Sequence, residues 1–173
     1  MPAPGYHRPQ AQRRGKATRL QGTPGAVNTK PSKTLHLAIE SNLSDVALIG
    51  TAVRGVCTCS PLCEEAYGAM EVCVVEAVNN AIVHAYRHQA GCRVEAAITL
   101  HPDRISFEIS DFGVAIREFS PRILEFDPDV IATIPESGMG LFIIQSIMDE
   151  VSYRSENGRN TLCFCRYFNL PQA

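Results

Sequence analysis

The sequence predicts an α+β fold, a two-layer sandwich with helices on one face of a mixed sheet. Two observations indicate it: two long helical stretches lie in the first half of the chain, and two strand pairs joined by turn residues lie further on. The chain has 173 residues, of which 45% are hydrophobic and 20% charged, and this fits one folded domain with a modest appendage.

The first expected element is a half-buried strand that begins near residue 34. Three apolar residues alternate with polar neighbours there: Leu35, Leu37 and Ile39. A helical pattern follows over residues 45–59, and Pro61 interrupts it because proline cannot occupy a helix interior. A second, longer helix is expected over residues 63–88.

Two strand-like segments, 92–100 and 105–110, come next. The residues between them include proline and aspartate, so the pair is expected to form a hairpin. Residues 111–138 show little periodicity and hold three prolines. A connection of this length inside a compact domain is usually a lid or a binding loop.

The last expected elements are a helix over residues 140–150 and a second hairpin. Strand segments 151–155 and 161–168 flank Asn157-Gly158, a dipeptide that strongly favours a hairpin turn. The predicted order is therefore strand, two helices, two strands, lid, helix and two strands.

Charge is distributed unevenly along the chain. Residues 1–33 hold seven Lys or Arg and no acidic residue, whereas the remainder holds nine basic and 18 acidic residues. The first segment also nearly lacks large apolar side chains, so we expect a disordered basic tail before a domain at 34–173. The tail is either a solvated extension or an arm for nucleic acid or an acidic partner. The acidic charge of the domain argues against direct DNA binding by the domain itself.

Cysteine usage and hydropathy indicate an intracellular setting. Seven cysteines are an odd number, and no apolar run is long enough for a secretory signal or a membrane span, so we expect a cytoplasmic protein without disulfides. Cys57, Cys59 and Cys63 lack the paired spacing of a zinc site. The cysteines are expected to be reduced and to pack as small hydrophobes, with Cys163 and Cys165 on one strand face.

The second helix carries a polar stripe. Glu76, Asn80 and His84 lie within about 80° of one another at about 100° per residue, and apolar residues occupy the opposite side. One interpretation is a solvated helix face. The other is a functional site, because a solvated face usually holds Lys, Arg and Glu, whereas this one combines Glu with Asn and His.

Two further motifs come later in the chain. A strand ends in Asp111-Phe112-Gly113, where aspartate commonly forms a turn. Gly138 and Gly140 stand at the start of a helix, where free backbone N–H groups favour phosphate. A lone Gly-x-Gly is weak evidence, and the sequence contains neither the dinucleotide-binding pattern nor the P-loop pattern.

In their order and spacing, these motifs resemble the GHKL ATP-binding superfamily, and most closely its bacterial anti-sigma-factor serine kinases. The matching segments are Glu76-Ala-Val-Asn-Asn80-Ala-Ile-Val-His84-Ala-Tyr86, Asp111-Phe-Gly113 and Ser137-Gly-Met-Gly140-Leu-Phe-Ile-Ile-Gln-Ser-Ile-Met-Asp149-Glu-Val. The resemblance covers residues 34–168 and implies the two-layer sandwich of the GHKL (Bergerat) type, with ATP and Mg²⁺ as cofactors.

The resemblance also implies roles for individual residues. Glu76 would be the general base that takes the proton of an attacking serine hydroxyl. Asn80 would hold the Mg²⁺ that bridges the ATP phosphates, and Asp111 would accept a hydrogen bond from the adenine amino group. His84 would either contact phosphate or have a structural role.

Other residues of the implied ATP site surround these four. Gly113, Gly138 and Gly140 would shape the pocket and the hinge of the lid, and Thr161 would help to close the adenine end. Met139 and Leu141 belong to the same nucleotide-binding motif.

One residue departs from the family pattern. The first glycine motif reads Asp111-Phe-Gly113-Val-Ala115, where the family usually has a second glycine. Ala115 adds a methyl group and disfavours positive φ, which would weaken ATP binding or alter the lid. The lid contains no lysine, so Arg117 and Arg122 are the alternative cationic contacts to the γ-phosphate.

The function that the resemblance implies is that of an ATP-dependent serine kinase. It would sequester a sigma factor and phosphorylate a STAS-type anti-anti-sigma protein, and it would form a homodimer as related kinases do. The alternative is an ATP-binding regulatory module without phosphoryl transfer, which Ala115 would favour. A split histidine kinase is a third possibility, but no helical segment with a phosphoacceptor histidine precedes the domain in this sequence.

Overall fold

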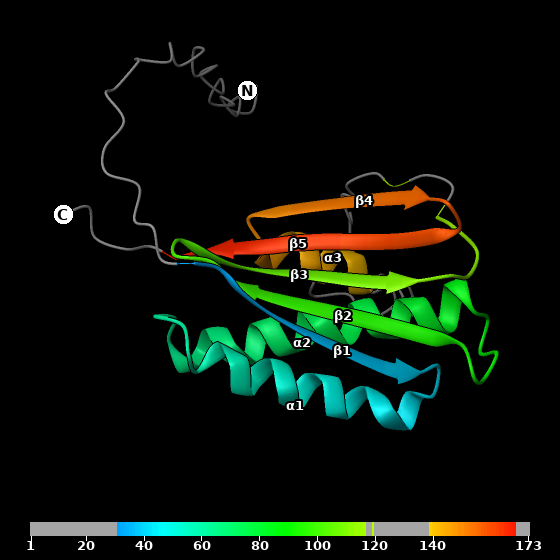
Figure 1. Cartoon of the computed structure of the whole chain (residues 1–173), viewed down its shortest axis with the longest axis horizontal. Coiled ribbons are helices and arrows are strands. Elements are labelled where there is room, and N and C mark those ends of the chain that lie inside the picture. The colour runs from blue at the N-terminus through cyan, green and yellow to red at the C-terminus, as the bar shows by residue number, and fades with distance from the viewer. Residues whose placement is uncertain (1–30, 117–118, 120–138, 169–173) are drawn as a thin grey trace, which may run out of the picture.

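A computed structural model describes residues 31–116, 119 and 139–168 (Figure 1). Residues 1–30 of the expected tail, Arg117, Arg122 and Gly138 lie outside the described residues. The elements in chain order are β1 (Lys33–Glu40), η1 (Leu43–Asp45), α1 (Val46–Cys57), α2 (Glu64–Asn80), η2 (Ala81–Ala85), β2 (Arg93–Leu100), β3 (Arg104–Asp111), α3 (Met139–Ile147), β4 (Glu150–Glu156) and β5 (Arg159–Tyr167).

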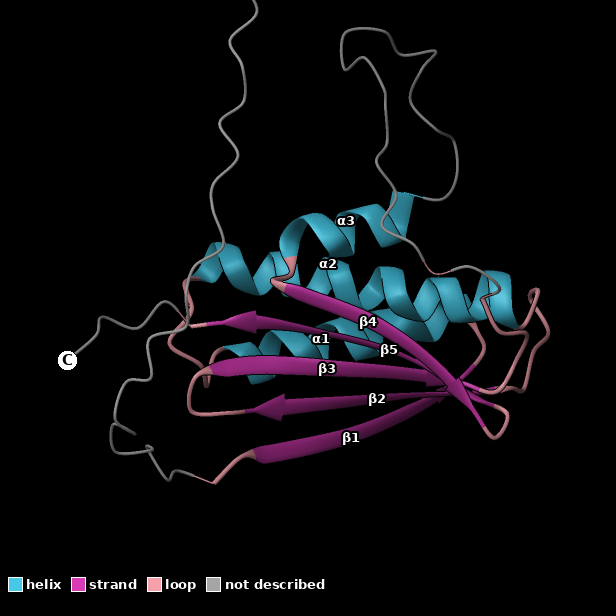
Figure 2. Ribbon diagram, turned by 90° about the horizontal axis from the view of Figure 1, so that it is seen from above, coloured by secondary structure: helices cyan, strands magenta, loops and turns pink. Residues whose placement is uncertain are grey.

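The five strands form one sheet in the order β1-β2-β3-β5-β4, and the helices cover one of its faces (Figure 2). The predicted α+β sandwich and both predicted hairpins are confirmed. The expectation of a mixed sheet is wrong, because every neighbouring pair is antiparallel. Two consecutive helices connect β1 to β2, so the chain reverses direction three times and enters β2 antiparallel to β1.

The helices agree with the predicted ones except at the ends of the second and the third, since α3 ends at Ile147 and Glu150 already belongs to β4. Residues 45–59 and 140–150 were expected to be helical, and α1 and α3 lie there. The helix predicted over 63–88 is too long, because α2 ends at Asn80 and a π-helical turn follows. In that turn Tyr86 N donates to Ala81 O at 2.9 Å, and a hydrogen bond across five residues is the π-helical pattern. None of the described helices is long and apolar enough to cross a membrane.

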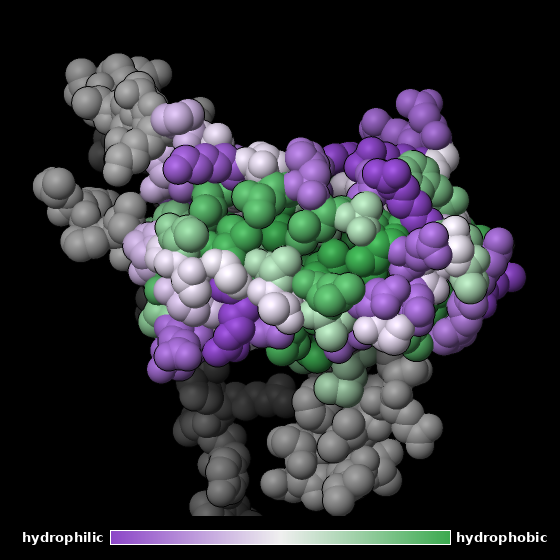
Figure 3. Space-filling view, turned by 60° about the horizontal axis from the view of Figure 1, so that its bottom comes forward, coloured by the Kyte–Doolittle hydropathy of each residue, from purple (hydrophilic) through white to green (hydrophobic). Residues whose placement is uncertain are grey.

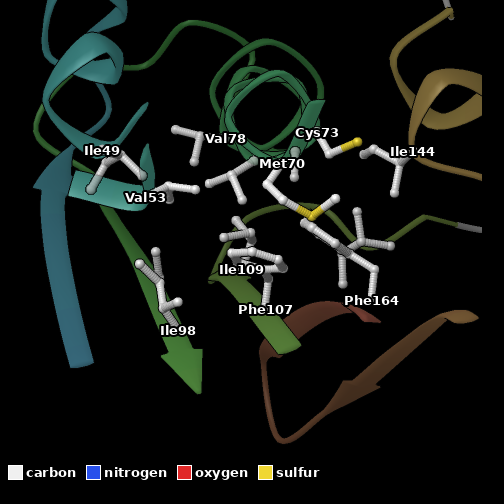
Figure 4. Close-up of a cluster of buried hydrophobic side chains, with 14 of the residues drawn as sticks. Ile49, Val53, Met70, Cys73, Val78, Ile98, Phe107, Ile109, Ile144 and Phe164 are labelled. Carbon is white, nitrogen blue, oxygen red and sulfur yellow. The ribbon is translucent and has the colours of Figure 1, made fainter. Parts of the chain in front are cut away.

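The hydrophobic core lies between the helices and the central strands (Figure 4). Alternate residues of β2, β3 and β5 point toward the helices, as the period of two requires. The rings of Phe107 in β3 and Phe164 in β5 stack with their centroids 5.4 Å apart. The side chains that the helices contribute include Ile49, Val53, Met70, Cys73, Val78 and Ile144. This core holds α2 and α3 against the strands that carry the other predicted site residues.

All seven cysteines are free thiols. Cys57 and Cys73 are fully buried, and burial raises their pKa to about 11 and about 12. The expectation that the cysteines are packed is wrong for Cys59 and Cys63, which are exposed at the connection between α1 and α2. Within the described part of the chain, no group of three or more His, Cys, Asp or Glu could hold a metal ion.

Candidate functional site

The polar stripe of the second helix divides at the end of α2. Glu76 and Asn80 lie one turn apart and are both half-buried. Neither side chain has a hydrogen-bond or ion-pair partner among the described residues. His84 lies in the π-helical turn and is exposed, because the wider turn departs from the regular helical spacing. A contact of His84 with phosphate therefore stays a prediction.

The start of α3 lies directly against Glu76 and Asn80. A Cβ atom at Gly140 would come within 2.5 Å of Glu76 Oε2 and 3.3 Å of Asn80 Nδ2. Only a residue without a side chain lets the α3 backbone approach α2 this closely. Gly140 is buried, and its neighbours Met139 and Leu141 are half-buried. The structure thus brings three of the predicted residues, Glu76, Asn80 and Gly140, into one place.

Asp111 ends β3, and hydrogen bonds fix the orientation of its carboxylate. Its Oδ1 atom accepts from Gly113 N at 2.9 Å and from Asn160 Nδ2 at 2.7 Å. Burial raises the pKa of this carboxyl, and the two donors oppose that rise. Oδ2 has no partner in the described parts of the chain, so it is the oxygen available to a ligand.

The loop after β3 is attached to the π-helical turn. A Cβ at Gly113 would collide with the carbonyl oxygen of Ala85 and come within 2.9 Å of Tyr86 Cδ1. Val114 N donates to Ala85 O at 2.9 Å, and Phe112 N donates to Tyr86 Oη at 2.8 Å. These contacts fix the end of the second helix relative to the end of β3, which are the two halves of the predicted site.

Replacing Gly113 with alanine is expected to lower the free energy of unfolding by about 1–3 kcal/mol, because the added methyl group meets main-chain atoms. Gly55→Ala in α1 is the matched control. No atom lies within 4 Å of a Cβ at Gly55, so that change should be neutral or slightly stabilising. Urea unfolding measures both variants, and equal stabilities would contradict the close approach at Gly113.

Thr161 and Asn160 lie on opposite faces of β5. Thr161 is buried on the face away from the helices, where its hydroxyl lies 3.0 Å from Ser110 Oγ. Asn160 points to the helix side and contacts Asp111. A role for Thr161 at the adenine end stays a prediction, and the structure adds Asn160, which the sequence motifs did not reveal.

Ala115 is exposed and does not have a positive φ. The described non-glycine residues with positive φ are Arg87, His88 and Asn157. Alanine in place of the family's second glycine is therefore accommodated without backbone strain. The alternative of a module without phosphoryl transfer gains no support from the backbone at this position.

The chemistry of these residues fits ATP and Mg²⁺. Mg²⁺ prefers oxygen ligands, and Asn80 offers an amide oxygen without a competing partner in the described structure. The free Oδ2 of Asp111 suits an amino group such as that of adenine. The close approach at Gly140 leaves no side chain between the start of α3 and the Glu76–Asn80 pair.

Comparison with known families agrees with this arrangement. The family model described as the histidine kinase-like ATPase domain matches residues 39–166. The chain belongs to this family. The match includes Glu76, Asn80, Asp111 and Gly140, so the resemblance noted in the sequence is confirmed at the level of the family.

Relatives of this histidine kinase-like ATPase domain are serine-protein kinases. Serine-protein kinase RsbW of Bacillus mycoides (strain KBAB4) is 26% identical over 143 residues, which are 80% of this chain and 88% of that protein. RsbW of Bacillus cereus (strain AH187) is 24% identical over 142 residues, with the same two shares. Both are similar to this chain over nearly the whole described domain.

A solved structure confirms the fold. The crystal structure of the RsbU and RsbW domains of Rv1364c from Mycobacterium tuberculosis matches with a TM-score of 0.56 at 14% sequence identity. The match covers 79% of this chain and 33% of that chain. The histidine kinase-like sandwich that the sequence motifs implied is therefore the fold of this domain.

Proposed function

We propose that this histidine kinase-like domain is an ATP-dependent serine kinase that sequesters a sigma factor and phosphorylates a STAS-type anti-anti-sigma protein. The observation that carries the proposal is the Glu76–Asn80 pair, half-buried against Gly140 and without partners in the described structure. An ordinary polar helix face is solvated, whereas this one lies against the start of a second helix. The RsbW relatives supply the reaction class.

Glu76 is the proposed general base. Its carboxylate takes the proton of the partner's serine hydroxyl while the serine oxygen bonds to the γ-phosphorus and the bond to the ADP oxygen breaks. Asn80 would hold Mg²⁺ through its amide oxygen, and such an ion would neutralise charge on the phosphates. A base and a metal ligand one helical turn apart are both needed at the reacting phosphate.

In this proposal Asp111 recognises the adenine base of the nucleotide. Its Oδ2 accepts from the adenine amino group, while Gly113 and Asn160 occupy Oδ1. Guanine would place a carbonyl oxygen against the same carboxylate, and two acceptors repel. ATP should therefore bind more tightly than GTP.

Labelled ATP tests the proposed reaction. The full chain is incubated with γ-³²P-ATP, magnesium and a purified STAS-type candidate partner, and the labelled amino acid is identified. Label on a serine of the partner supports the proposal, whereas label on histidine would identify a histidine kinase instead. Retained ATP binding without label on any candidate would favour a regulatory module.

The proposed homodimer would use the apolar face formed by α1 and β1. Figure 3 shows a broad hydrophobic area on the side of the molecule that carries these elements. Leu48 of α1 is 65% exposed and Leu35 of β1 is 43% exposed, and Leu37 and Ile39 are only half-buried. β1 is also an edge strand of the sheet. A two-fold dimer needs one self-complementary patch, and an apolar face beside a strand edge offers such a patch.

Leu48→Asp is expected to shift the protein from dimer to monomer, because dimerisation would bury an unpaired charge. Size-exclusion chromatography with light scattering measures the mass. Val114→Asp is the matched control, since Val114 is 54% exposed but lies on the loop after β3. A wild type that is monomeric, or a dimer that Leu48→Asp leaves intact, would contradict this interface.

A further inference from the structure

Asn160 is a buried side chain that is hydrogen-bonded on every side. Its Nδ2 donates to Asp111 Oδ1 at 2.7 Å and to Gly113 O at 3.1 Å, and its Oδ1 accepts from Ser155 Oγ at 2.8 Å. Only 2% of the residue is exposed. The reversed amide would set an oxygen against two acceptors, so the network itself determines the orientation. With its donors and acceptor in use, Asn160 acts on Asp111 rather than on a ligand.

This network fixes the plane of the Asp111 carboxylate and occupies one of its two oxygens. Oδ1 accepts two hydrogen bonds, one from Gly113 N and one from Asn160 Nδ2. Turning the carboxylate by half a rotation would only exchange equivalent oxygens, but tilting it away would leave a buried amide without its acceptor, which is costly. The carboxylate is therefore held with Oδ1 accepting two hydrogen bonds and Oδ2 without a partner among the described residues.

We propose that Asn160 is a positioning residue for nucleotide binding, which orients the Asp111 carboxylate so that Oδ2 accepts from the adenine amino group. Ser155 in β4 holds Asn160 in turn. This inference rests on the proposed ATP-binding function. It assigns a role in base recognition to a β5 residue outside the helix and glycine motifs.

The surrounding charges leave Asn160 as a main support of the ionised carboxylate. Burial raises the pKa of Asp111, and the hydrogen bond from Asn160 is the largest influence that lowers it. Among the described residues, the other titratable groups near this end of β3 are Tyr86, Tyr153 of β4 and Glu95, which forms ion pairs with Arg159 and Arg93. Burial raises the pKa of both phenols, so they are neutral near pH 7. Loss of Asn160 should therefore raise the pKa of Asp111 further, and a protonated Asp111 is a weaker acceptor.

Asn160→Ala tests the inference through ATP affinity, measured by calorimetry from pH 5 to pH 8. We expect affinity about 10–100-fold weaker near pH 7.5, as for the loss of a hydrogen bond to a charged group. As the pH is lowered, the variant should lose its ATP affinity at a higher pH than the wild type does. The ratio of ATP affinity to GTP affinity should also be smaller in the variant. A purely structural role would lower the free energy of unfolding without these changes.

Ser41→Ala is the matched control for a buried hydrogen bond. Ser41 is 4% exposed, and its Oγ donates to Gln89 O and accepts from Cys92 N, away from Asp111. The variant should lose stability and keep the wild-type ATP affinity and pH profile. A shift in its pH profile equal to that of Asn160→Ala would overturn the inference.

Ser155→Ala provides a second variant if Asn160→Ala does not fold. Ser155 is exposed, and its removal leaves Asn160 in place but less firmly held. We expect ATP affinity about 2–10-fold weaker and a raised Asp111 pKa by carbon-13 NMR of the free protein. Unchanged affinity and an unchanged Asp111 pKa would overturn the inference. A wild type that binds no ATP would instead refute the proposed function, and this inference with it.

Discussion

Replacing Glu76 with glutamine is expected to slow phosphoryl transfer by about 10²–10⁴-fold while ATP affinity stays close to that of the wild type. Glutamine keeps the shape of the side chain and an oxygen beside Gly140, so the contact between α2 and α3 should persist. It cannot take the serine proton at neutral pH, because an amide is too weak a base. Single-turnover transfer to a STAS partner measures the rate, and calorimetry measures the affinity for ATP.

Glu71→Gln is the control for this change. Glu71 lies on the same helix but forms an ion pair with Arg54 of α1 at 3.4 Å, and neither side chain belongs to the site. The same loss of charge there should leave the transfer rate unchanged, because partly exposed ion pairs contribute little. Both variants should still bind the sigma factor. Transfer at the wild-type rate by Glu76→Gln would show that Glu76 is not the base and that positioning alone drives the reaction.

Local patterns in the sequence predict most of the fold, but they fail where tertiary contacts decide. The alternation in the strands and the Asn157-Gly158 turn are local, and the two hairpins form as predicted. The residues from Ala81 to Ala90 include no glycine or proline, so no local signal in the sequence indicates the π-helical turn. That turn is held from outside, because Val114 N donates to Ala85 O and Phe112 N donates to the hydroxyl oxygen of Tyr86.

The helix side of the candidate site is predictable and its strand side is less so. Glu76 and Asn80 share a helix face in any regular helix. Gly140 at a helix start predicts that the backbone approaches a ligand, and its close approach to α2 is seen only in the structure. The partner of Asp111, in contrast, depends on the register between β3 and β5, which are separated by the lid and α3. A shift of one residue would exchange Asn160 for Thr161 at that position, and no local pattern distinguishes the two.

Asn80→Ala is expected to weaken binding of Mg-ATP by at least about tenfold, because the site loses an oxygen ligand of the magnesium ion. The α2 backbone should be unaffected, since alanine is the best helix former and Asn80 has no partner in the described structure. EDTA should weaken ATP binding to the wild type and have much less effect on the variant. Calorimetry with and without EDTA measures both, and the thermal shift caused by ATP gives a second readout.

Asn79→Ala separates a specific loss from a general one. Asn79 is the neighbouring asparagine, equally half-buried, but about 100° further around the helix than Asn80. If Asn80 alone presents its amide to the phosphates, Asn79→Ala should keep the wild-type affinity and the wild-type response to EDTA. Equal losses in the two variants would mean that any cavity in this part of α2 disturbs binding. Equal affinity of the wild type and Asn80→Ala for Mg-ATP would show that magnesium is held by other ligands. The proposed pairing of Glu76 as base with a metal ligand one turn along α2 would then be wrong.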